Sequence, residues 1–307
     1  MRLGLYTFSL QRVPFDELLD LASESGIEAL ELGVSGRAAT PGFEAETLLQ
    51  DSERRAEIQE SIAKHGMAIS ALNATSNPLH PNGEIRKRYL SGLKAAIRLA
   101  AQLGVTRVVT GAGCPGESER SRHPAWVVFS EGYQTVLEWQ WEQAAVPIWK
   151  EIAAYAKEHG VRICIEVLPG TLTYNTDSFL RFRSLIGETI GANFDPSHLI
   201  WQGMDPRVVA RAWTGGIYHA HAKDTLINEA EVSRNGVIEI RPFADWESRS
   251  WSFCTVGDGH DAAFWRSVLT SMQAAGYDDV WSIEHEDPTL DERAGVRRNA
   301  DFLRRLL

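Results

Sequence analysis

The feature that most constrains the fold of this chain is an alternation of amphipathic helical segments with short β-rich segments. Leu93, Ile97 and Ala100 illustrate the helical part, because apolar residues there recur three or four positions apart. Glycine, which readily adopts the left-handed conformation that closes a helix, directly precedes several of the β-rich segments, at Gly26, Gly66, Gly104, Gly160 and Gly276. Helices that alternate with strands predict parallel strands joined by crossover helices.

The β-rich segments can be placed at eight points along the 307 residues, near 2–7, 28–33, 67–72, 106–111, 161–166, 190–195, 216–221 and 279–284. This number of strands in a chain of this length predicts a single closed (β/α)8 barrel, one TIM-barrel domain over residues 1–307. An open, doubly wound sheet with fewer strands is the alternative fold.

Composition restricts the compartment and the class of partner. No apolar run is long enough to span a bilayer, and the N-terminus reads directly into a strand, without the pattern of a secretory signal. Cys114, Cys164 and Cys254 are few, odd in number and widely spaced, which fits a reducing compartment. We therefore expect a cytoplasmic protein without a membrane partner.

The charge balance bears on the substrate. The net charge is −10 and the sequence has no run rich in lysine and arginine. Proteins that bind the phosphate backbone of nucleic acids usually carry a basic face. A small molecule is therefore expected as the substrate rather than nucleic acid. A homo-oligomer is compatible with the sequence, which does not define the oligomeric state.

Two connections are unusually long, from about 111 to 147 and from about 222 to 264, after the fourth and seventh strands. Long loops in compact domains are usually functional or disordered, and disordered segments lack aromatic residues. These loops are rich in them, including Trp126, Tyr133, Trp139, Trp141, Trp246 and Trp251. We expect both loops to lie over the C-terminal mouth of the barrel, with Trp251 as a wall of the substrate site.

Four consecutive strands each end on a residue that can bind a metal: Glu166, Asp195, His221 and Glu284. The C-terminal strand ends are where the active sites of such barrels lie. Residues two positions apart on a strand share a face, and the residues two positions before these four are small or polar, namely Cys164, Asn193, His219 and Ser282. The four candidates are therefore expected to point into the barrel mouth.

A divalent cation would offset the repulsion between three converging carboxylates. Three oxygen donors and one imidazole suit Mn²⁺, Mg²⁺ or Co²⁺, with Zn²⁺ possible, and we favour Mn²⁺. Taken singly, a carboxylate at a strand end is more often a helix cap or a surface charge. Four candidates in register on adjacent strands favour one shared site.

The segments Asn193–His198, His219–Asp224 and Ser282–Asp287 resemble the xylose isomerase-like TIM-barrel superfamily, the sugar phosphate isomerase/epimerase group. The resemblance covers essentially the whole chain. It implies that Glu166, Asp195, His221 and Glu284 are metal ligands, that His198 lies near the substrate and the metal, and that Lys223 touches the substrate.

The superfamily includes epimerases, isomerases, inosose dehydratases, lyases acting on 3-keto-sugars and an endonuclease for abasic DNA. The chain departs from the tagatose-type ketose epimerases at Leu172 and Ile227, where those enzymes place a glutamate and an arginine. Its third strand ends at Leu72–Asn73 without the histidine that the endonuclease branch uses. Nucleic-acid repair is therefore a remote alternative. A non-catalytic sugar-binding barrel is another, because both candidate bases, Glu166 and Glu284, are retained.

The resemblance and the ligand pattern together predict a metal-dependent sugar isomerase or epimerase that removes a proton next to a carbonyl. Glu166 and Glu284 are the expected bases, because each carboxylate retains a second oxygen when it binds a metal through one. Elimination by a lyase or dehydratase acting on 3-keto-sugars or inososes shares this first step and remains the alternative. The turn Gly257–His260 precedes a helix and is either an ordinary helix start or a phosphate site.

Overall fold

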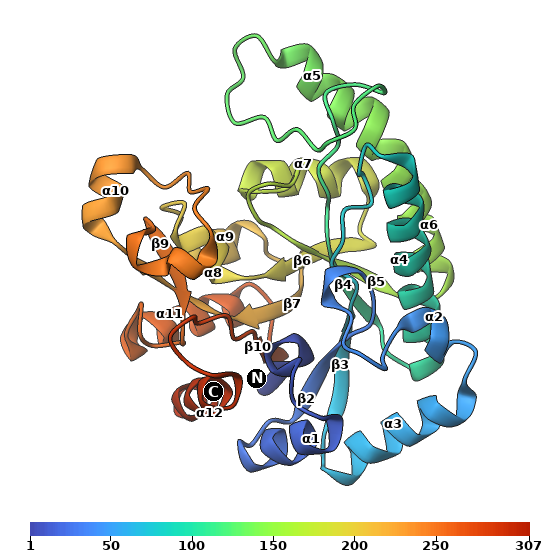
Figure 1. Ribbon diagram of the computed structural model, residues 1–307, viewed down its shortest axis with the longest axis vertical. Helices are drawn as coiled ribbons and strands as arrows, with labels where there is room; N and C mark the ends of the chain where they lie inside the picture. Colours follow the sequence, from blue (N-terminus) through green and yellow to red (C-terminus); the bar gives the residue numbers. More distant parts are fainter. The chain divides into compact units, whose positions relative to one another are not determined.

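The computed structural model describes residues 1–307, with the side chain of Ala38 left aside, and confirms the predicted TIM barrel (Figure 1). Parallel strands form a closed barrel in the order β1-β10-β7-β6-β5-β4-β3-β2. Every predicted strand is present within two residues of its expected bounds, as β1 (Arg2–Tyr6), β2 (Ala29–Gly33), β3 (Ala68–Asn73), β4 (Arg107–Gly111), β5 (Arg162–Glu166), β6 (Ile190–Phe194), β7 (Ile217–Ala222) and β10 (Val280–Ile283).

Helices connect the strands, as the alternation predicts. The longer ones are α1 (Phe15–Glu24), α3 (Ser52–Lys64), α4 (Gly83–Leu103), α6 (Val146–Glu158), α7 (Thr176–Ile186), α11 (Ala262–Ala274) and α12 (Glu292–Leu303). Gly104 closes α4 with a φ of 71°, and the glycines before β2, β3, β5 and β10 also have positive φ, which explains the glycine that precedes each of these strands. None of the described helices has the length and apolar character needed to cross a membrane.

The chain divides into two compact units. The first unit comprises Met1–Glu31, Ile58–Ser70 and Phe194–Leu307. In it, β10 pairs with β1 and with β7, with Ser282 opposite His221. The N- and C-terminal segments of this unit are tied together by an ion pair between Arg12 and Glu292 at 2.8 Å.

The second unit comprises Leu32–Glu57 and Ala71–Asn193. Here β5 pairs with β4 and β6, so that Glu166 lies opposite Gly111 on one side and Asn193 on the other. Helices α4 and α6 lie side by side and are linked by Lys94 and Glu151 (Figure 1). Trp149 is fully buried and its indole N–H donates to the carbonyl of Ala112 at 2.9 Å, so this tryptophan belongs to the core.

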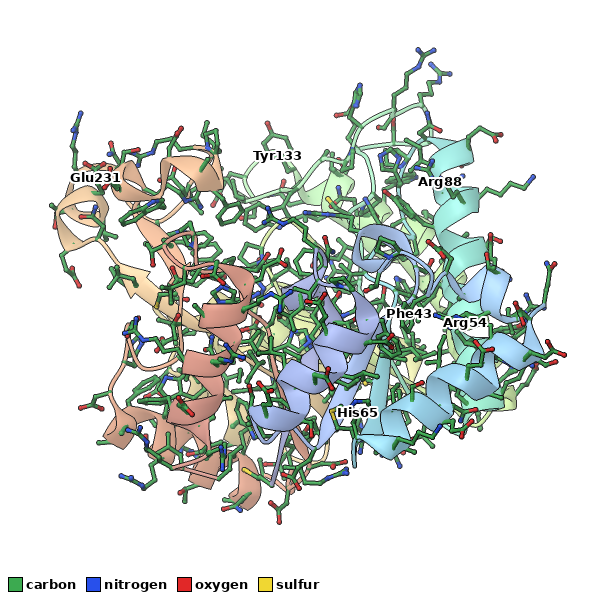
Figure 2. All side chains as sticks on the ribbon, turned by 60° about the horizontal axis from the view of Figure 1, so that its bottom comes forward. Phe43, Arg54, His65, Arg88, Tyr133 and Glu231 are labelled. Carbon is green, nitrogen blue, oxygen red and sulfur yellow. The ribbon has the colours of Figure 1, made fainter. Side chains whose placement is uncertain are left out.

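The segment after β7 contains a hairpin that the sequence analysis expected only as a loop. Strands β8 (Asp224–Ile227) and β9 (Trp251–Cys254) pair in antiparallel fashion, with α10 (Glu229–Asn235) in the connection between them (Figure 1). Arg241 braces this connection, because its guanidinium contacts Glu239 at 2.7 Å and Glu231, labelled in Figure 2, at 3.3 Å.

Candidate metal centre

The first unit gathers three of the four predicted ligands. Asp195 directly follows β6, His221 lies in β7, and Glu284 directly follows β10. One ligand atom from each lies within 4.8 Å of the others. The apolar neighbours Phe194, Ala220 and Ile283 are fully buried, in keeping with the predicted alternation of the strands.

The geometry and chemistry of these donors fit a divalent ion. Nδ1 of His221 lies 3.0 Å from Oε2 of Glu284, and two ligands at right angles around an ion, each about 2.1 Å away, would be about 3 Å apart. Two carboxylates and an imidazole are hard or borderline donors that suit such ions. Burial raises the pKa of the Cys114 thiol to about 11 and also raises that of Cys254, so neither is a ready thiolate ligand.

Lys223 places a buried positive charge among the acids of this cluster. Its ammonium donates to Oε2 of Glu284 at 2.6 Å and to Oε2 of Glu286 at 2.9 Å, and lies 3.2 Å from Oδ2 of Asp195. Burial raises the pKa of Glu284, while Lys223 and His221 oppose that rise. The predicted substrate contact is thus also a counter-charge to two predicted ligands.

His198 lies beside the same cluster. It belongs to the short helix α8 (Pro196–Ile200), whose N-terminus is capped by Asp195 through a hydrogen bond from the Ser197 amide at 2.9 Å. Nε2 of His198 lies 3.4 Å from Oδ2 of Asp195. Asp195 is therefore both a helix cap and a ligand candidate, two roles that the sequence analysis had weighed as alternatives.

The aromatic neighbour of these substrate-contact candidates is Phe253, which the sequence analysis did not single out. Its ring makes an edge contact with His198 at 5.4 Å and lies 4.4 Å from the Lys223 ammonium. Trp251 instead stacks on Trp201 at 4.4 Å, and its indole N–H donates to the carbonyl of Val237. Trp251 also contacts Phe253, with ring centroids 5.4 Å apart, and its role as a wall of the substrate site remains a prediction.

Glu31 is a second residue that the sequence analysis missed. It lies in β2, is fully buried, and has its Oε2 2.8 Å from Nε2 of His219 and 3.0 Å from Nε2 of His221. Burial alone would raise the pKa of Glu31, but the two facing histidines lower it overall. An acidic residue between Leu30 and Leu32 in a buried strand was the available signal.

Glu166, the fourth predicted ligand, ends β5 in the second unit. It is 6% exposed, and fully buried Cys164 lies two residues before it on the strand. The structure therefore confirms its strand-end position and its burial. Its membership of the ligand set remains a prediction.

The turn before α11 is an ordinary helix start, which was one of the two alternatives that its sequence left open. The carboxylate of Asp224 accepts hydrogen bonds from the amides of Gly257 at 3.1 Å and His260 at 3.0 Å, and from the indole of Trp265 at 2.9 Å. A Cβ on Gly259 would lie 2.3 Å from the carbonyl oxygen of Thr225, so the turn packs tightly on β8. A protein carboxylate thus occupies the amides that a phosphate would need.

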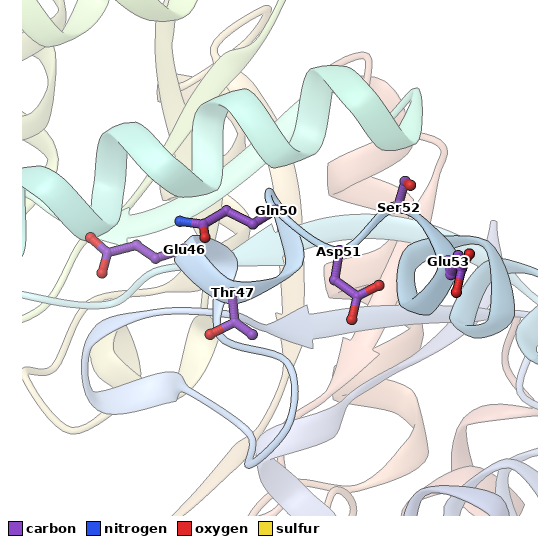
Figure 3. A pocket seen from close by; sticks show the side chains of 6 residues that line it. All are labelled: Glu46, Thr47, Gln50, Asp51, Ser52 and Glu53. Carbon is purple, nitrogen blue, oxygen red and sulfur yellow. The ribbon is translucent and has the colours of Figure 1, made fainter.

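The second unit also carries a shallow hollow of about 530 Å³ at the connection between α2 (Ala45–Leu48) and α3 (Figure 3). Its walls are surface residues, largely acidic or amide side chains, namely Glu46, Thr47, Gln50, Asp51, Ser52 and Glu53. These are separate from the predicted ligands, so we do not assign the hollow to the active site.

Comparisons with known proteins agree with this fold. A sequence model described as xylose isomerase-like TIM barrel matches residues 19–306. The uncharacterized protein YfiH of Bacillus subtilis (strain 168) is 34% identical over 312 residues, covering 100% of this chain and 99% of YfiH. An inosose dehydratase of Yersinia enterocolitica is 25% identical over 183 residues, 58% of each protein.

A solved structure of similar fold is that of the IolI protein with a bound zinc atom. It superimposes with a TM-score of 0.71 at 17% identity, covering 100% of this chain and 98% of IolI. At this level of identity the likeness shows a shared fold.

Proposed function

Since the chain belongs to the xylose isomerase-like TIM-barrel family, we propose that it is a divalent-metal-dependent isomerase or epimerase of a sugar or polyol. The observation that carries the proposal is the buried cluster of Asp195, His221 and Glu284, with the ammonium of Lys223 among its carboxylates. A hydrophobic core has no need of such a cluster, because isolated buried charges destabilise a fold.

We propose Glu166, Asp195, His221 and Glu284 as the ligands of one ion, with Mn²⁺ favoured and Mg²⁺, Co²⁺ or Zn²⁺ acceptable to the same donors. The inclusion of Glu166 is supported by the strand order, in which β5 precedes β6 and β7, because parallel barrel strands end on one face. A bound ion would supply Lewis acidity, which makes a C–H bond next to a carbonyl more acidic.

Proton transfer is assigned to Glu284 and Glu166. The ammonium of Lys223 lies 2.6 Å from Oε2 of Glu284 and favours its ionised form, the form that a general base needs. Return of the proton to the same carbon from the opposite face gives an epimer, and return to the neighbouring carbon gives an isomer. Lys223 and His198 are placed to hold substrate oxygens by hydrogen bonds, beside the apolar ring of Phe253.

Elimination is the second candidate, and a specific observation favours it. The chain resembles an inosose dehydratase in part of its length, and Leu172 and Ile227 stand where tagatose-type epimerases carry a glutamate and an arginine. A dehydratase would begin with the same proton abstraction. The hydroxyl on the next carbon would then leave as water, with Lys223 or His198 as the proton donor.

The test is a screen of Mn²⁺-loaded protein in D₂O against free ketoses, 3-keto-sugars and inososes, followed by proton NMR. Deuterium at the carbon next to the carbonyl, with a new epimer or isomer, supports the first proposal. Loss of water from the substrate supports elimination. Absence of exchange in all three substrate classes would contradict both, provided that the Mn²⁺ content of the same sample has been measured.

A further inference from the structure

The proposed reaction gives no role to Glu31 and His219, which form a buried trio with the proposed ligand His221. All three side chains are inaccessible to solvent, and both Nε2 atoms face the same carboxylate oxygen of Glu31, at 2.8 Å and 3.0 Å. The pairing is not needed to close the barrel, because strands close through backbone hydrogen bonds. It therefore needs an explanation of its own.

The hydrogen atoms of this trio can be assigned from its acceptors. An ionised carboxylate is an acceptor only, so Nε2 of His221 must carry the hydrogen atom when it bonds to Glu31. Nδ1 of His221 faces Oε2 of Glu284 at 3.0 Å, on the side of the candidate metal centre, and can donate a hydrogen bond to it. An ion held by both residues would replace that hydrogen atom, because a metal-bound imidazole nitrogen supplies its lone pair, whereas the hydrogen atom on Nε2 would stay with Glu31.

Contacts with other residues also restrict the orientation of the His221 ring. Tyr6 stacks on the imidazole with a centroid distance of 5.6 Å and an interplanar angle of 16°. His219, which shares Glu31 with His221, lies 3.2 Å from the hydroxyl of Ser282 on the neighbouring strand. His219 thus contacts the same carboxylate oxygen of Glu31 as His221 does.

We propose that Glu31 is a positioning residue of the metal centre: it accepts a hydrogen bond from Nε2–H of His221 and so presents Nδ1 to the ion. A histidine ligand whose other nitrogen donates to a carboxylate is held in one tautomer and becomes a better donor to the metal. The inference rests on the proposed metal-dependent function.

A second ion bound by Glu31, His219 and His221 is the competing explanation, since these atoms also lie within 4.8 Å of one another. Hydrogen bonds account for the 2.8 Å and 3.0 Å separations without an ion. The His221 ring would have to serve two ions through its two nitrogens. We therefore favour the single-ion arrangement, and the stoichiometry of binding distinguishes the two.

The test compares wild-type protein with Glu31→Gln, using Zn²⁺ as a diamagnetic probe. A competing chelator gives the zinc affinity, and ¹⁵N-resolved NMR of the imidazoles gives the protonated and metal-bound nitrogens of His221. Glu28→Gln is the matched control, because Glu28 precedes the same strand, carries the same charge and accepts from the backbone amide of Leu3.

We expect wild-type His221 to show hydrogen on Nε2 and zinc on Nδ1, and Glu31→Gln to bind zinc about 10- to 100-fold more weakly with an altered Nε2 signal. Glu28→Gln should match wild type. Equal affinity and an unchanged spectrum in Glu31→Gln would overturn the inference, as would zinc on Nε2 or a second zinc ion per chain. If Glu31→Gln does not fold, the wild-type spectrum tests the inference by showing which nitrogen of His221 carries hydrogen and which one binds zinc. Failure of wild type to bind zinc, manganese, magnesium or cobalt would instead remove the proposed function.

Discussion

Two fully buried carboxylates in the first unit, Glu31 and Asp224, differ in the groups that face them. Asp224 accepts hydrogen bonds from the backbone amides of Thr225, Gly257 and His260 and from two ring N–H groups. Glu31 faces two imidazoles of β7. Burial and charge are the same at both positions, so they do not distinguish the roles of the two residues.

The identity of the donors distinguishes them. Backbone amides are fixed by the chain, so a carboxylate that binds them fixes a turn, here the one that leads into α11. An imidazole has a second nitrogen, so a carboxylate that binds one nitrogen determines what the other can do. Lys223 and Asp224 are adjacent in sequence and show the same division, because Lys223 contacts the candidate metal centre and Asp224 the turn.

The largest effect on folding is expected from Asp224→Ala. It leaves several buried donors without an acceptor, which should lower the free energy of unfolding by about 3–5 kcal/mol, measured by urea denaturation. The folded fraction should still bind metal. Asp258→Ala, which removes a carboxylate from the same turn and its ion pair with Arg298, should cost less than about 1 kcal/mol. Loss of metal without loss of stability in Asp224→Ala would reverse the roles assigned to the two clusters.

Glu284→Gln is expected to act on catalysis rather than on folding. The amide can still offer an oxygen to a metal but cannot take a proton, so turnover should fall by about 100-fold or more, while part of the metal is retained. Steady-state rates on the substrate found by the screen provide the measurement. Glu286→Gln is the matched control, because Glu286 contacts the same Lys223 ammonium without being a ligand candidate, and it should change turnover by less than about tenfold. A wild-type rate in Glu284→Gln would exclude this residue as the base.

Removal of metal should lower the melting temperature of the wild-type protein. A ligand present at about 100 times its dissociation constant stabilises the folded state by about 2.7 kcal/mol, and a chelator removes that contribution. In His221→Ala the chelator should produce no shift, whereas Asp224→Asn, although less stable, should still respond. A wild-type melting curve that is unaffected by both chelator and added Mn²⁺ would argue against a resident ion.

The smallest expected effect concerns Asp287, which, like Asp224, accepts hydrogen bonds from backbone amides. Burial raises its pKa, but hydrogen bonds from Thr289 and Thr255 outweigh burial and lower the pKa overall. A carboxyl whose pKa is lower in the folded state contributes stability above its unfolded pKa, which is lost as the pH falls through the folded value. Asp287→Asn should therefore flatten the loss of stability between neutral pH and about pH 3, measured by denaturation at each pH. An unchanged slope would show that Asp287 does not contribute to it.

The strands were predictable because glycine marks the helix ends and because strand periodicity is short and regular. The same alternation predicted that Asp195, His221 and Glu284 come together, and one ligand atom of each lies within 4.8 Å of the others. Glu31 does not follow from the pattern of strand ends, because it lies inside β2 and its partners His219 and His221 are distant in sequence, although an acid between two leucines in a strand is a comparable signal. The neighbours of Trp251 and Phe253 were not predictable, because they depend on the pairing of the hairpin, in which Phe253 lies opposite Thr225 and Trp251 opposite Ile227. That pairing depends on contacts distant in sequence.

The central claim is that the strand ends Glu166, Asp195, His221 and Glu284 hold one divalent ion. Elemental analysis of purified wild-type protein, Asp195→Ala and His221→Ala tests it most directly, after equilibration with Mn²⁺ and removal of loosely bound metal. We predict about one ion per wild-type chain and loss of most of it in each variant, with the fold confirmed by circular dichroism. Full metal occupancy in both folded variants would contradict the assignment.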